Sequence, residues 1–257
     1  MHSPLAYIHP NAQLGAHVTI DPFAVVQEGT VIGDHCHIYS HAVIMPGTRL
    51  GKRVRVFPGA VIGAIPQDLK FAGEDSSVVI GDDSTIRESA TINRGTAAFG
   101  KTVIGKECLI MANAHVAHDC ILGDHVILVN SVALAGHVVI GDYAILGGLS
   151  AVHQFVHIGA HAMIGGGTLV RKDIPPFIKV AKEPLAFEGV NAIGLERRGF
   201  SSEQIEDIHQ AYRLLYQSGL NTSQAVEKIV SACPPTPERD AILTFVQTAE
   251  RGIVKGR

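Results

Sequence analysis

Aliphatic residues recur at every sixth position along the first two thirds of the chain. Starting at Ile8 and stepping by six to Val170 gives 28 positions, of which 25 hold Leu, Ile or Val. These three residue types make up 69 of the 257 residues, so chance alone would give about 7 or 8 matches. The pattern is therefore an internal repeat. A strict six-residue step drifts around an α-helix and cannot keep one of its faces apolar.

The repeat predicts short strands joined by corners. Residues two apart in a strand point the same way, and the position two before the aliphatic residue is often small, as at Ala42 and Ala60. Glycines after the aliphatic residue recur mostly 18 residues apart, which is three repeats. Three strands and three corners then form one coil, so the chain is predicted to build a parallel β-helix of triangular section with about nine coils.

Three positions break the repeat: Asp68, Glu74 and Ala98. Segments 63–79 and 94–103 are therefore expected to leave the coil as loops and to return in register. Loops that project from a rigid scaffold often carry function, whereas tolerated surface insertions would produce the same pattern. The sequence leaves both interpretations open.

The repeat ends near residue 170, where two consecutive prolines follow and interrupt regular pairing, and an irregular stretch is expected from there to about Gly199. Beyond them, a capping-box pattern and two further start signals predict three helices that begin near Ser201, Thr222 and Pro237. We therefore expect a mainly β protein with two domains, a β-helix over residues 1–186 and a C-terminal helical domain over residues 187–257.

The composition argues against several classes of protein. A formal charge of −3 provides no strong field for nucleic acid or for an anionic membrane surface. No apolar run is long enough to span a bilayer and the first residues lack a secretory signal pattern, so we expect a cytoplasmic protein without membrane insertion. Cys36, Cys108 and Cys120 fall in the small inward position of the repeat, and no CxxC spacing exists. We interpret them as packing residues rather than as disulfides or metal ligands.

One segment interrupts the aliphatic pattern with titratable residues: Asn113-Ala-His-Val-Ala-His-Asp-Cys120. Residues 18 apart should lie above one another at about 4.8 Å per coil. This stacking predicts two adjacent columns of side chains, one of His118, Gly136 and Gln154 and the other of Asp119, His137 and Phe155. The cluster expected on this edge of the coil comprises His115, His118, Asp119, His137 and Gln154.

The cluster has the residue types of a general-base site. Histidine is suited to proton transfer near neutral pH, and Asp119 would fix the tautomer of His118 and stabilise its charged form. Gly136 has no side chain, so a substrate carbonyl could approach its backbone N–H as in an oxyanion hole. These features favour acyl transfer with His118 as the base. The remaining members of the cluster are expected to contact substrate: His115, His137 and Gln154.

Most of the 14 histidines need no functional explanation. Those at outward corners of the predicted coil are expected to be solvated surface residues. These are His35, His41, His125 and His161. His118 differs from them because an aspartate neighbour, a glycine column and two nearby histidines surround it.

Seven short motifs lie in order along the repeat and the region after it. They are Gln67-Asp-Leu-Lys70, Ile86-Arg-Glu-Ser89, Asn113-Ala-His-Val-Ala-His-Asp-Cys120, Leu134-Ala-Gly-His137, Ala151-Val-His-Gln-Phe155, Gly189-Val-Asn191 and Arg197-Arg-Gly-Phe200. Together with the hexapeptide repeat they closely resemble the family of UDP-N-acetylglucosamine O-acyltransferases that starts lipid A synthesis. The resemblance spans nearly the whole chain, including the helical region.

The resemblance implies a left-handed coil and a homotrimer with active sites in the clefts between subunits. It also implies transfer of an (R)-3-hydroxyacyl group from acyl carrier protein to the 3-hydroxyl of UDP-N-acetylglucosamine, with no metal or organic cofactor. His118 matches the family's general base, Asp119 its orienting partner and Gly136 the backbone donor to the thioester oxyanion. Positions that hold the sugar nucleotide or the acyl donor are matched by Asp68, Lys70, His115, His137, Gln154, Asn191, Arg197 and Arg198.

Three positions bear on substrate choice. Gly166 stands where the family has its acyl-length ruler; a glycine there implies an open groove for a chain of about fourteen carbons, unless it is an ordinary corner glycine. The family more often has His at the position of Asn93 and Glu at that of Ile193, and both places are associated with the acceptor sugar. An acceptor with a 3-amino group in place of the 3-hydroxyl therefore remains open.

A set of basic residues near the end of the coil would complement an acidic acyl carrier protein, although four carboxylates interleave with it. The basic residues are Arg171, Lys172, Lys179, Lys182, Arg197 and Arg198.

Three other interpretations of the whole chain remain. The first is a different hexapeptide acyltransferase, such as the related N-acyltransferase or an acetyl-CoA-dependent enzyme. The second is a β-helical zinc enzyme with His115, His118 and His137 as ligands. The third is a purely structural coil.

Overall fold

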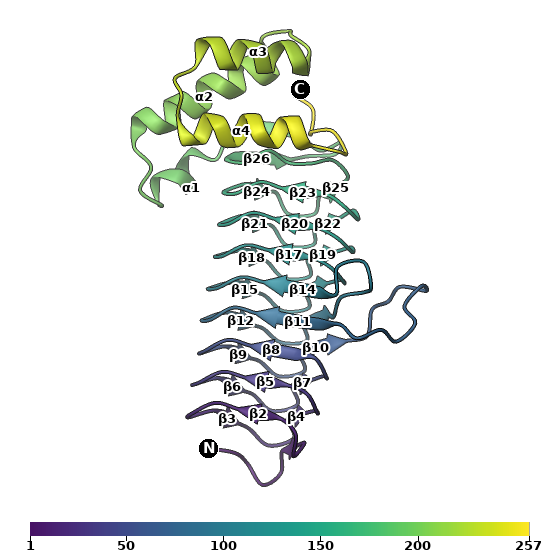
Figure 1. Ribbon diagram of the computed structural model, residues 1–257. Coiled ribbons are helices and arrows are strands. Elements are labelled where there is room, and N and C mark those ends of the chain that lie inside the picture. The colour runs from purple at the N-terminus through teal and green to yellow at the C-terminus, as the bar shows by residue number, and fades with distance from the viewer. Residues whose placement is uncertain (257) are drawn as a thin grey trace.

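The computed structural model describes residues 1–256, which form a long three-sided coil with a helical domain stacked on its end (Figure 1). The faces are sheets of nine, eight and ten strands, parallel throughout except for the last pair of the third sheet. Within the coil each strand up to the last turn pairs with the strand three places later in the chain, so the chain visits the three faces in turn. This is the parallel β-helix that the six-residue step predicts.

The faces are built from short strands, most of them two residues long. The first face consists of β1 (Tyr7–Ile8), β4 (Val25–Val26), β7 (Val43–Ile44), β10 (Val61–Ala64), β13 (Thr91–Asn93), β16 (His115–Val116), β19 (Ala133–Leu134), β22 (Ala151–Val152) and β25 (Leu169–Val170). The second consists of β2 (Gln13–Leu14), β5 (Val31–Ile32), β8 (Thr48–Leu50), β11 (Ser77–Ile80), β14 (Lys101–Ile104), β17 (Ile121–Leu122), β20 (Val139–Ile140) and β23 (His157–Ile158). The third consists of β3 (Thr19–Ile20), β6 (His37–Ile38), β9 (Arg55–Val56), β12 (Thr85–Ile86), β15 (Leu109–Ile110), β18 (Ile127–Leu128), β21 (Ile145–Leu146), β24 (Met163–Ile164), β26 (Ile178–Ala181) and β27 (Ala186–Val190).

The core of the coil is the aliphatic column that the sequence predicts. Repeat residues such as Ile38, Ile62 and Ile110 are completely buried, and each such side chain contributes about 1.5–3 kcal/mol on burial. The small residues two positions earlier, such as Ala42, are equally buried because there is little room beside the corners. The cysteines predicted for this position, Cys36, Cys108 and Cys120, are buried there as free thiols.

The three faces meet at three edges, and each edge is a column of corner residues. The first edge joins the first face to the second and includes Asp119, His137 and Phe155; the second edge joins the second face to the third and includes Tyr143 and His161. The third edge joins the third face back to the first. Many corners hold non-glycine residues with φ near +60°, a left-handed conformation that repeats in register with the coil.

Two loops leave the coil, both from the first edge, and the longer one projects far from it (Figure 1). They span residues 65–76 and 94–100, so the predicted bounds 63–79 and 94–103 were wrong by up to three residues at the ends. The reason is that the flanking strands lengthen. β11 and β14 pair with each other over four residues, from Ser77 opposite Lys101 to Ile80 opposite Ile104. Both loops therefore return in register, as predicted.

The last coil passes into a helical domain through β26, which pairs with β24 in parallel and with β27 in antiparallel direction. The helices are α1 (Ala192–Glu196), α2 (Ser202–Gln217), α3 (Thr222–Ala232) and α4 (Pro237–Thr248). The three predicted helices are confirmed, including the Ser201–Gln204 capping box. The stretch before them was expected to be irregular, which is wrong, since it holds β26, β27 and α1. A domain boundary between residues 186 and 187 stays a prediction; β27 begins at that point.

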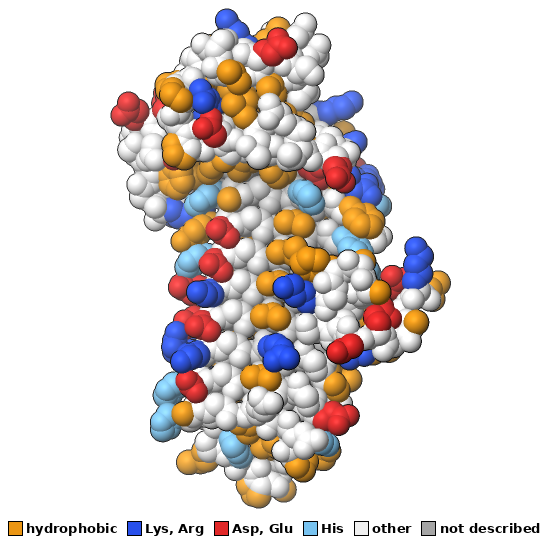
Figure 2. All heavy atoms as spheres, viewed as in Figure 1, with side chains coloured by type: hydrophobic (Ala, Val, Ile, Leu, Met, Phe, Trp, Pro, Cys, Tyr) orange, Lys and Arg blue, Asp and Glu red, His pale blue; other side chains and the backbone are white. Residues whose placement is uncertain are grey.

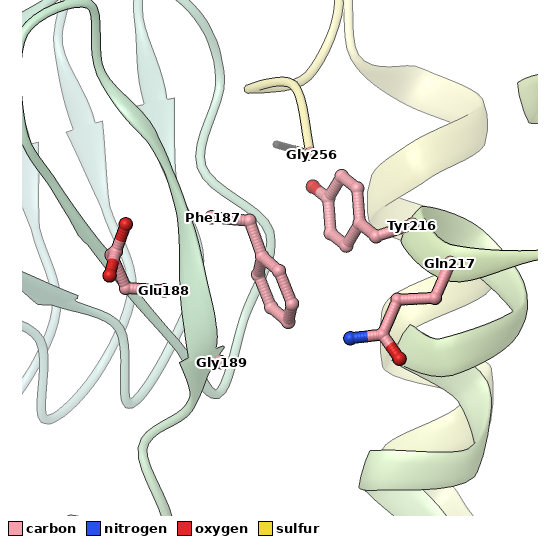
Figure 3. A pocket seen from close by; sticks show the side chains of 6 residues that line it. All are labelled: Phe187, Glu188, Gly189, Tyr216, Gln217 and Gly256. Atoms are coloured by element: carbon pink, nitrogen blue, oxygen red, sulfur yellow. The ribbon is translucent and has the colours of Figure 1, made fainter.

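The helical domain packs on the end of the coil through aromatic side chains. Tyr212 is fully buried and donates a hydrogen bond to the Pro176 carbonyl. Phe187 of β27 faces Tyr216 of α2 with 4.4 Å between ring centroids, beside a cavity of about 310 Å³ (Figure 3). None of the helices in the described chain has the length and apolarity to cross a membrane. Charged side chains run down one side of the coil, and acidic and basic side chains mark the loop that projects from the other side (Figure 2).

Candidate active site

His118 and Asp119 form a buried pair at the first edge. They follow β16 and precede β17, and Asp119 takes the left-handed corner conformation at φ 59°, which Asp tolerates better than most residues. Nδ1 of His118 lies 2.9 Å from a carboxylate oxygen of Asp119, and the two side chains are 10% and 0% exposed. With Nδ1–H donating to Asp119, Nε2 of His118 is the nitrogen left free to accept a proton.

The Asp119 carboxylate is held from the shorter loop. The backbone N–H of Thr96 donates to Oδ1 at 3.0 Å, and its hydroxyl donates to Oδ2 at 2.6 Å. The backbone N–H of Asp119 itself donates to Oγ1 of Thr102 at 2.9 Å. Burial alone would raise the pKa of Asp119, but the hydrogen bonds from Thr96 and His118 outweigh it and hold that pKa below its ordinary value. The carboxylate is therefore ionised and fixed.

Gly136 lies directly against the His118 ring. A Cβ atom on Gly136 would be 2.5 Å from Cε1 and 2.6 Å from Nε2 of His118, so only glycine leaves the imidazole in place. The Gly136 N–H donates no hydrogen bond within residues 1–256. A free backbone donor therefore lies beside the free nitrogen of His118, which is the arrangement needed to move a proton and stabilise an oxyanion at one point.

The stacked columns predicted from the 18-residue spacing are confirmed. His137 N–H donates to the His118 carbonyl at 3.0 Å, and Phe155 N–H donates to the Gly136 carbonyl at 3.2 Å. The His137 ring stacks on Phe155 with 4.6 Å between centroids and meets His118 edge-on at 5.1 Å. Nε2 of His137 is 3.7 Å from Asp119.

Two predicted members of the cluster stand apart from this core. His115 lies on the outer side of β16, with Nδ1 2.8 Å from the hydroxyl of Thr91, and burial lowers its pKa. The side chain of Gln154 is half-buried and makes no hydrogen bond within the described residues, whereas its carbonyl lies 3.2 Å from Nδ1 of His153. The structure thus joins His118, Asp119 and His137, but among the described residues neither His115 nor Gln154 makes a hydrogen bond, ion pair or ring contact with His118.

The longer loop brings two predicted residues to the same edge. Asp68 accepts a hydrogen bond from the backbone N–H of Lys70 at 3.0 Å, and the side chain of Lys70 is exposed. Burial lowers the pKa of His137 below its ordinary value, although the carboxylates of Asp119 and Asp68 act in the opposite direction. The charge of Asp68 therefore acts on His137 at the first edge.

The other predicted substrate-binding residues lie elsewhere. Asn191 is buried beside the second edge, where its amide donates to the His161 carbonyl at 3.0 Å. Arg198 donates to the Tyr143 carbonyl at 3.0 Å and covers the Tyr143 ring, while Arg197 is exposed. Gly166 belongs to the third edge, stacked on Gly148. The predicted site residues of one chain thus occupy three different edges.

The expectation that His161 is a solvated surface residue is wrong. Its ring is stacked between Tyr143 and Phe177, at 5.0 and 5.6 Å, and Phe200 from the helical domain covers its edge. Burial lowers its pKa to about 4. The prediction failed because the aromatic residues that enclose His161 come from the column and from a distant segment. His35 and His41 are exposed as expected, and His125 is half-buried against Tyr143.

The two positions tied to the acceptor differ in environment. Asn93 is buried at the base of both loops, where its amide donates to the Ile65 carbonyl at 3.1 Å and its Oδ1 has no partner. Ile193, in contrast, is 62% exposed in α1.

Among the described residues, one group has the geometry for a metal ion: His118, Asp119 and His137, whose ligand atoms lie within 4.8 Å of one another. This is not the set of three histidines considered from the sequence, because His115 is bound to Thr91. The group offers two nitrogens and a carboxylate oxygen, a donor set that zinc accepts. Thr96 and Thr102 were not anticipated at all. Their spacing does not indicate a role in the site, and the one signal in the sequence is that the repeat breaks nearby, at Ala98.

Comparisons with known proteins agree over nearly the whole chain. Residues 173–254 match the family described as UDP-N-acetylglucosamine O-acyltransferase, domain 2, and residues 11–45, 29–64 and 101–136 match the bacterial transferase hexapeptide family. The chain is 54% identical over 255 residues to an acyl-(acyl-carrier-protein)–UDP-N-acetylglucosamine O-acyltransferase of Trichlorobacter lovleyi, covering 98% of both chains. It is 59% identical over 248 residues to the protein of that name from Chlorobium phaeobacteroides, covering 96% and 94%.

Solved structures give the same result. The UDP-N-acetylglucosamine acyltransferase of Bacteroides fragilis superposes with a TM-score of 0.98 at 51% identity, covering 99% of this chain and all of that one. The Francisella novicida enzyme superposes with a TM-score of 0.96 at 39% identity, covering 99% and 94%. With the hexapeptide match, this likeness confirms the predicted fold class, a left-handed parallel β-helix followed by a helical domain.

Proposed function

The chain belongs to the UDP-N-acetylglucosamine O-acyltransferase family, and from this membership and the geometry of the first edge we propose how it works. It is an acyltransferase that moves an acyl group from acyl carrier protein to UDP-N-acetylglucosamine, the first step of lipid A biosynthesis. The finer assignment, an (R)-3-hydroxyacyl group placed on the 3-position of the sugar, is our proposal and rests on the matched motifs.

The observation that carries the mechanism is the position of His118, with Nδ1 on Asp119 and the free Nε2 over Gly136. Nε2 accepts the proton of the acceptor hydroxyl while the hydroxyl oxygen attacks the thioester carbonyl carbon. The C–S bond then breaks, the new C–O ester bond remains, and the imidazolium gives its proton to the leaving thiolate. Asp119 stabilises the imidazolium between these two steps.

Gly136 supplies the second element of the mechanism. Negative charge develops on the thioester oxygen during attack, and the unpaired Gly136 N–H can donate to it. Such a donor typically contributes about 10²-fold or more in rate. Because the donor is backbone, it is aimed by the coil itself and needs no side-chain ordering.

The test measures transfer from (R)-3-hydroxyacyl carrier protein to UDP-N-acetylglucosamine by the wild type and by His118→Ala. We expect the variant to lose about 10²-fold or more in rate. Equal activity of the two proteins would remove His118 from the chemistry. If the wild type transfers nothing to this acceptor, the proposed acceptor is wrong, and metal analysis should then test the zinc alternative at His118, Asp119 and His137.

The same assay should include the 3-amino analogue of the acceptor. Asn93 uses its amide on the Ile65 carbonyl, and Ile193 has no polar group for the sugar, so the usual acceptor contacts at these two positions are altered. A preference for the amine would make the product an amide and would identify the alternative acceptor. A preference for the hydroxyl would retain the ester product.

We propose that Asp68, Lys70, His115, His137 and Gln154 hold one part of the substrates and that Asn191, Arg197 and Arg198 hold another. The first group belongs to the first edge and its adjoining face, whereas Asn191 and Arg198 contact the second edge. The second face separates these edges within one chain. A ligand held by both groups therefore lies between two copies, which supports a homotrimer with its sites in the clefts. The exposed Leu149 and Phe155 on the coil support such packing.

Subunit mixing tests this arrangement. His118→Ala and Arg197→Ala are expected to be weakly active alone, but mixed oligomers should regain transfer because some clefts then combine an intact His118 with an intact Arg197. Sedimentation gives the oligomeric state, and two affinity tags verify mixing. A fully active monomer, or verified mixed oligomers with no regained activity, would contradict shared sites.

We further propose that acyl carrier protein docks near the end of the coil, with the reaction in the cytoplasm where both charged substrates are soluble. Arg171 and Lys182 lie close to Glu183 and Glu188, at 3.9 and 3.1 Å, so part of the basic set is already neutralised. The KM for the carrier should rise with salt. A flat salt response would argue against charge-guided docking.

Gly166 is proposed as the acyl-length ruler. A Cβ there would lie 3.0 Å from the Gly148 carbonyl, so the position is tight toward the coil and any larger side chain has to project outward. Gly166→Met should therefore shift preference toward shorter acyl chains. Unchanged preference with donors of defined length would exclude the ruler role.

A further inference from the structure

Thr96 is not among the residues expected to act in the chemistry or to hold substrate, yet it makes two hydrogen bonds to the reactive pair. Its N–H and its hydroxyl bind the two oxygens of Asp119, at 3.0 and 2.6 Å. The hydroxyl shares Oδ2 with Nδ1–H of His118. Both Thr96 and the Asp119 carboxylate are buried, so water does not replace this contact if it is lost.

The contact fixes the carboxylate in two respects. A pair of donors from one residue, one on each oxygen, restricts rotation of the carboxylate group, and Nδ1 of His118 meets Oδ2 at 2.9 Å. The hydrogen bond from the hydroxyl also stabilises the negative charge on Oδ2. Without it, Oδ2 would have only Nδ1–H of His118 and the more distant His137, at 3.7 Å.

A second layer supports Thr96 from the longer loop. One carboxylate oxygen of Glu74 accepts the N–H of Ala97 at 2.9 Å, and the other accepts the N–H of Ala72 at 2.8 Å. Glu74 thus ties its own loop to the residue next to Thr96. Arg94, at the start of the shorter loop, also covers the ring of Phe71 in the longer one. The two loops therefore contact each other, and the shorter one contacts Asp119 through Thr96.

We propose that Thr96 is a positioning residue for the acyl transfer: it keeps the Asp119 carboxylate aimed at Nδ1 of His118, with Glu74 supporting it from the other loop. The inference rests on the proposed role of His118 as base. It gives the two loops a function, which the sequence alone left undecided between function and tolerated insertion.

The first variant is Thr96→Val, which removes the hydroxyl, keeps the backbone N–H and preserves the shape of the side chain. We expect kcat to fall about 10-fold or more while KM for both substrates changes by less than about 2-fold, because Thr96 is buried and its hydroxyl contacts Asp119. The carboxylate also becomes more basic without the hydroxyl donor and holds the imidazolium more strongly. The acidic limb of the kcat/KM profile should therefore move to higher pH. Thr96→Ser should restore both quantities.

The matched control is Thr30→Val. Thr30 is also a fully buried threonine whose hydroxyl donates one hydrogen bond, to the Gln27 carbonyl at 2.9 Å, but it lies in an early coil far from the His118 pair along the chain. The Thr30→Val variant shows how much the loss of a buried threonine hydroxyl lowers the stability of the fold. Its kcat and pH profile should equal those of the wild type.

The outcomes separate this inference from the proposed function. If His118→Ala is inactive while Thr96→Val has the kcat and pH profile of Thr30→Val, Thr96 is only structural and the inference is wrong. If His118→Ala is as active as the wild type, the base assignment fails first. Should Thr96→Val not fold, Glu74→Gln decides, since its loop is on the surface. A loss in kcat of about 3-fold with the same pH shift supports the inference, and wild-type kinetics overturn it.

Discussion

The first and second edges of the coil share a backbone but differ in chemistry. Both are columns of left-handed corners, and both stack a histidine on a phenylalanine, His137 on Phe155 and His161 on Phe177. At the first edge, Asp119 lies within reach of two histidines. At the second, Phe200 covers His161, and Nδ1 of His161 is buried without a partner. The same corner geometry therefore supports a reactive pair at one edge and a packed ring at the other.

The comparison shows what makes a corner histidine reactive in this fold. A histidine in the ladder is not enough, because His161 has the same conformation and stacking as His137. The first edge adds an ionised carboxylate, a glycine that leaves room for the imidazole, and two loops that hold the carboxylate. The second edge adds an apolar cover from the helical domain, which removes His161 from proton chemistry near neutral pH.

The largest expected effect breaks the first edge at Gly136. In Gly136→Ala the new Cβ would meet the His118 ring at 2.5 Å, so the ring has to swing away from Asp119. We expect transfer to fall about 10²-fold or more with little loss of stability, because a side chain yields rather than backbone. Gly141→Ala, at the second edge, meets the backbone nitrogen of Ala160 at 2.6 Å and should instead lower the unfolding midpoint. Full activity in Gly136→Ala would remove the glycine from the site.

The second prediction removes the packed ring. His161→Ala should lower the free energy of unfolding by about 2 kcal/mol, the lower end of the usual cost of a large-to-small change, because the His161 side chain is half-buried. The kcat of the folded variant should stay within about 3-fold of the wild type, because His161 has no carboxylate partner. Denaturant titration and the transfer assay give the two values. A loss of kcat without a loss of stability would reverse the assignment of the two edges.

The third prediction concerns pH. The ordinary pKa of His161 is 6.5 and its folded-state pKa is about 4, chiefly through burial; Arg198 acts in the same direction and Asp142 against it. The unfolded chain therefore takes up a proton between these values that the folded chain does not. The stability from neutral His161 is present above pH 6.5 and is lost as the pH falls toward 4. His161→Phe should flatten this part of the stability profile relative to the wild type, and identical slopes would contradict it.

The smallest expected effect concerns a stacking contact at the first edge. Phe155 stacks on His137 and is 48% exposed, so Phe155→Leu removes the stacking contact while it keeps an apolar side chain. We expect KM for the sugar nucleotide to rise about 3-fold, since the stacking of such a pair is worth about 1 kcal/mol or less, and kcat to stay unchanged. A large loss in kcat would mean that His137 takes part in the chemistry.

Much of the fold followed from the sequence because a coil of this kind is periodic. A step of six fixes which residues face inward, and a step of 18 fixes which residues stack, so contacts such as those of His137 with Asp119 and Phe155 could be derived by counting. The left hand and the identity of the acceptor came only through family resemblance. The spacing of residues specifies neither the handedness of the coil nor the shape of a bound sugar.

The missed features share a physical cause, which is that they depend on segments outside the period. Thr96 reaches Asp119 from a loop, and loop conformation is set by contacts such as that of Glu74 with Ala97 rather than by spacing. His161 was misjudged because Phe200, which covers it, arrives from the helical domain. The helix α1 is a single short element held by its packing, which local sequence signals do not specify.

The direct pairing of β11 with β14 has a consequence for how such an enzyme can change. Because Ser77–Ile80 and Lys101–Ile104 align residue for residue around both loops, the coil keeps its register whatever length of chain is inserted between its strands. Each doubling of an insertion costs only about 0.6 kcal/mol of closure entropy. The loops can thus lengthen or shorten in evolution or in the laboratory while the scaffold that carries the reactive pair stays as it is, provided that Thr96 and Glu74 keep their contacts.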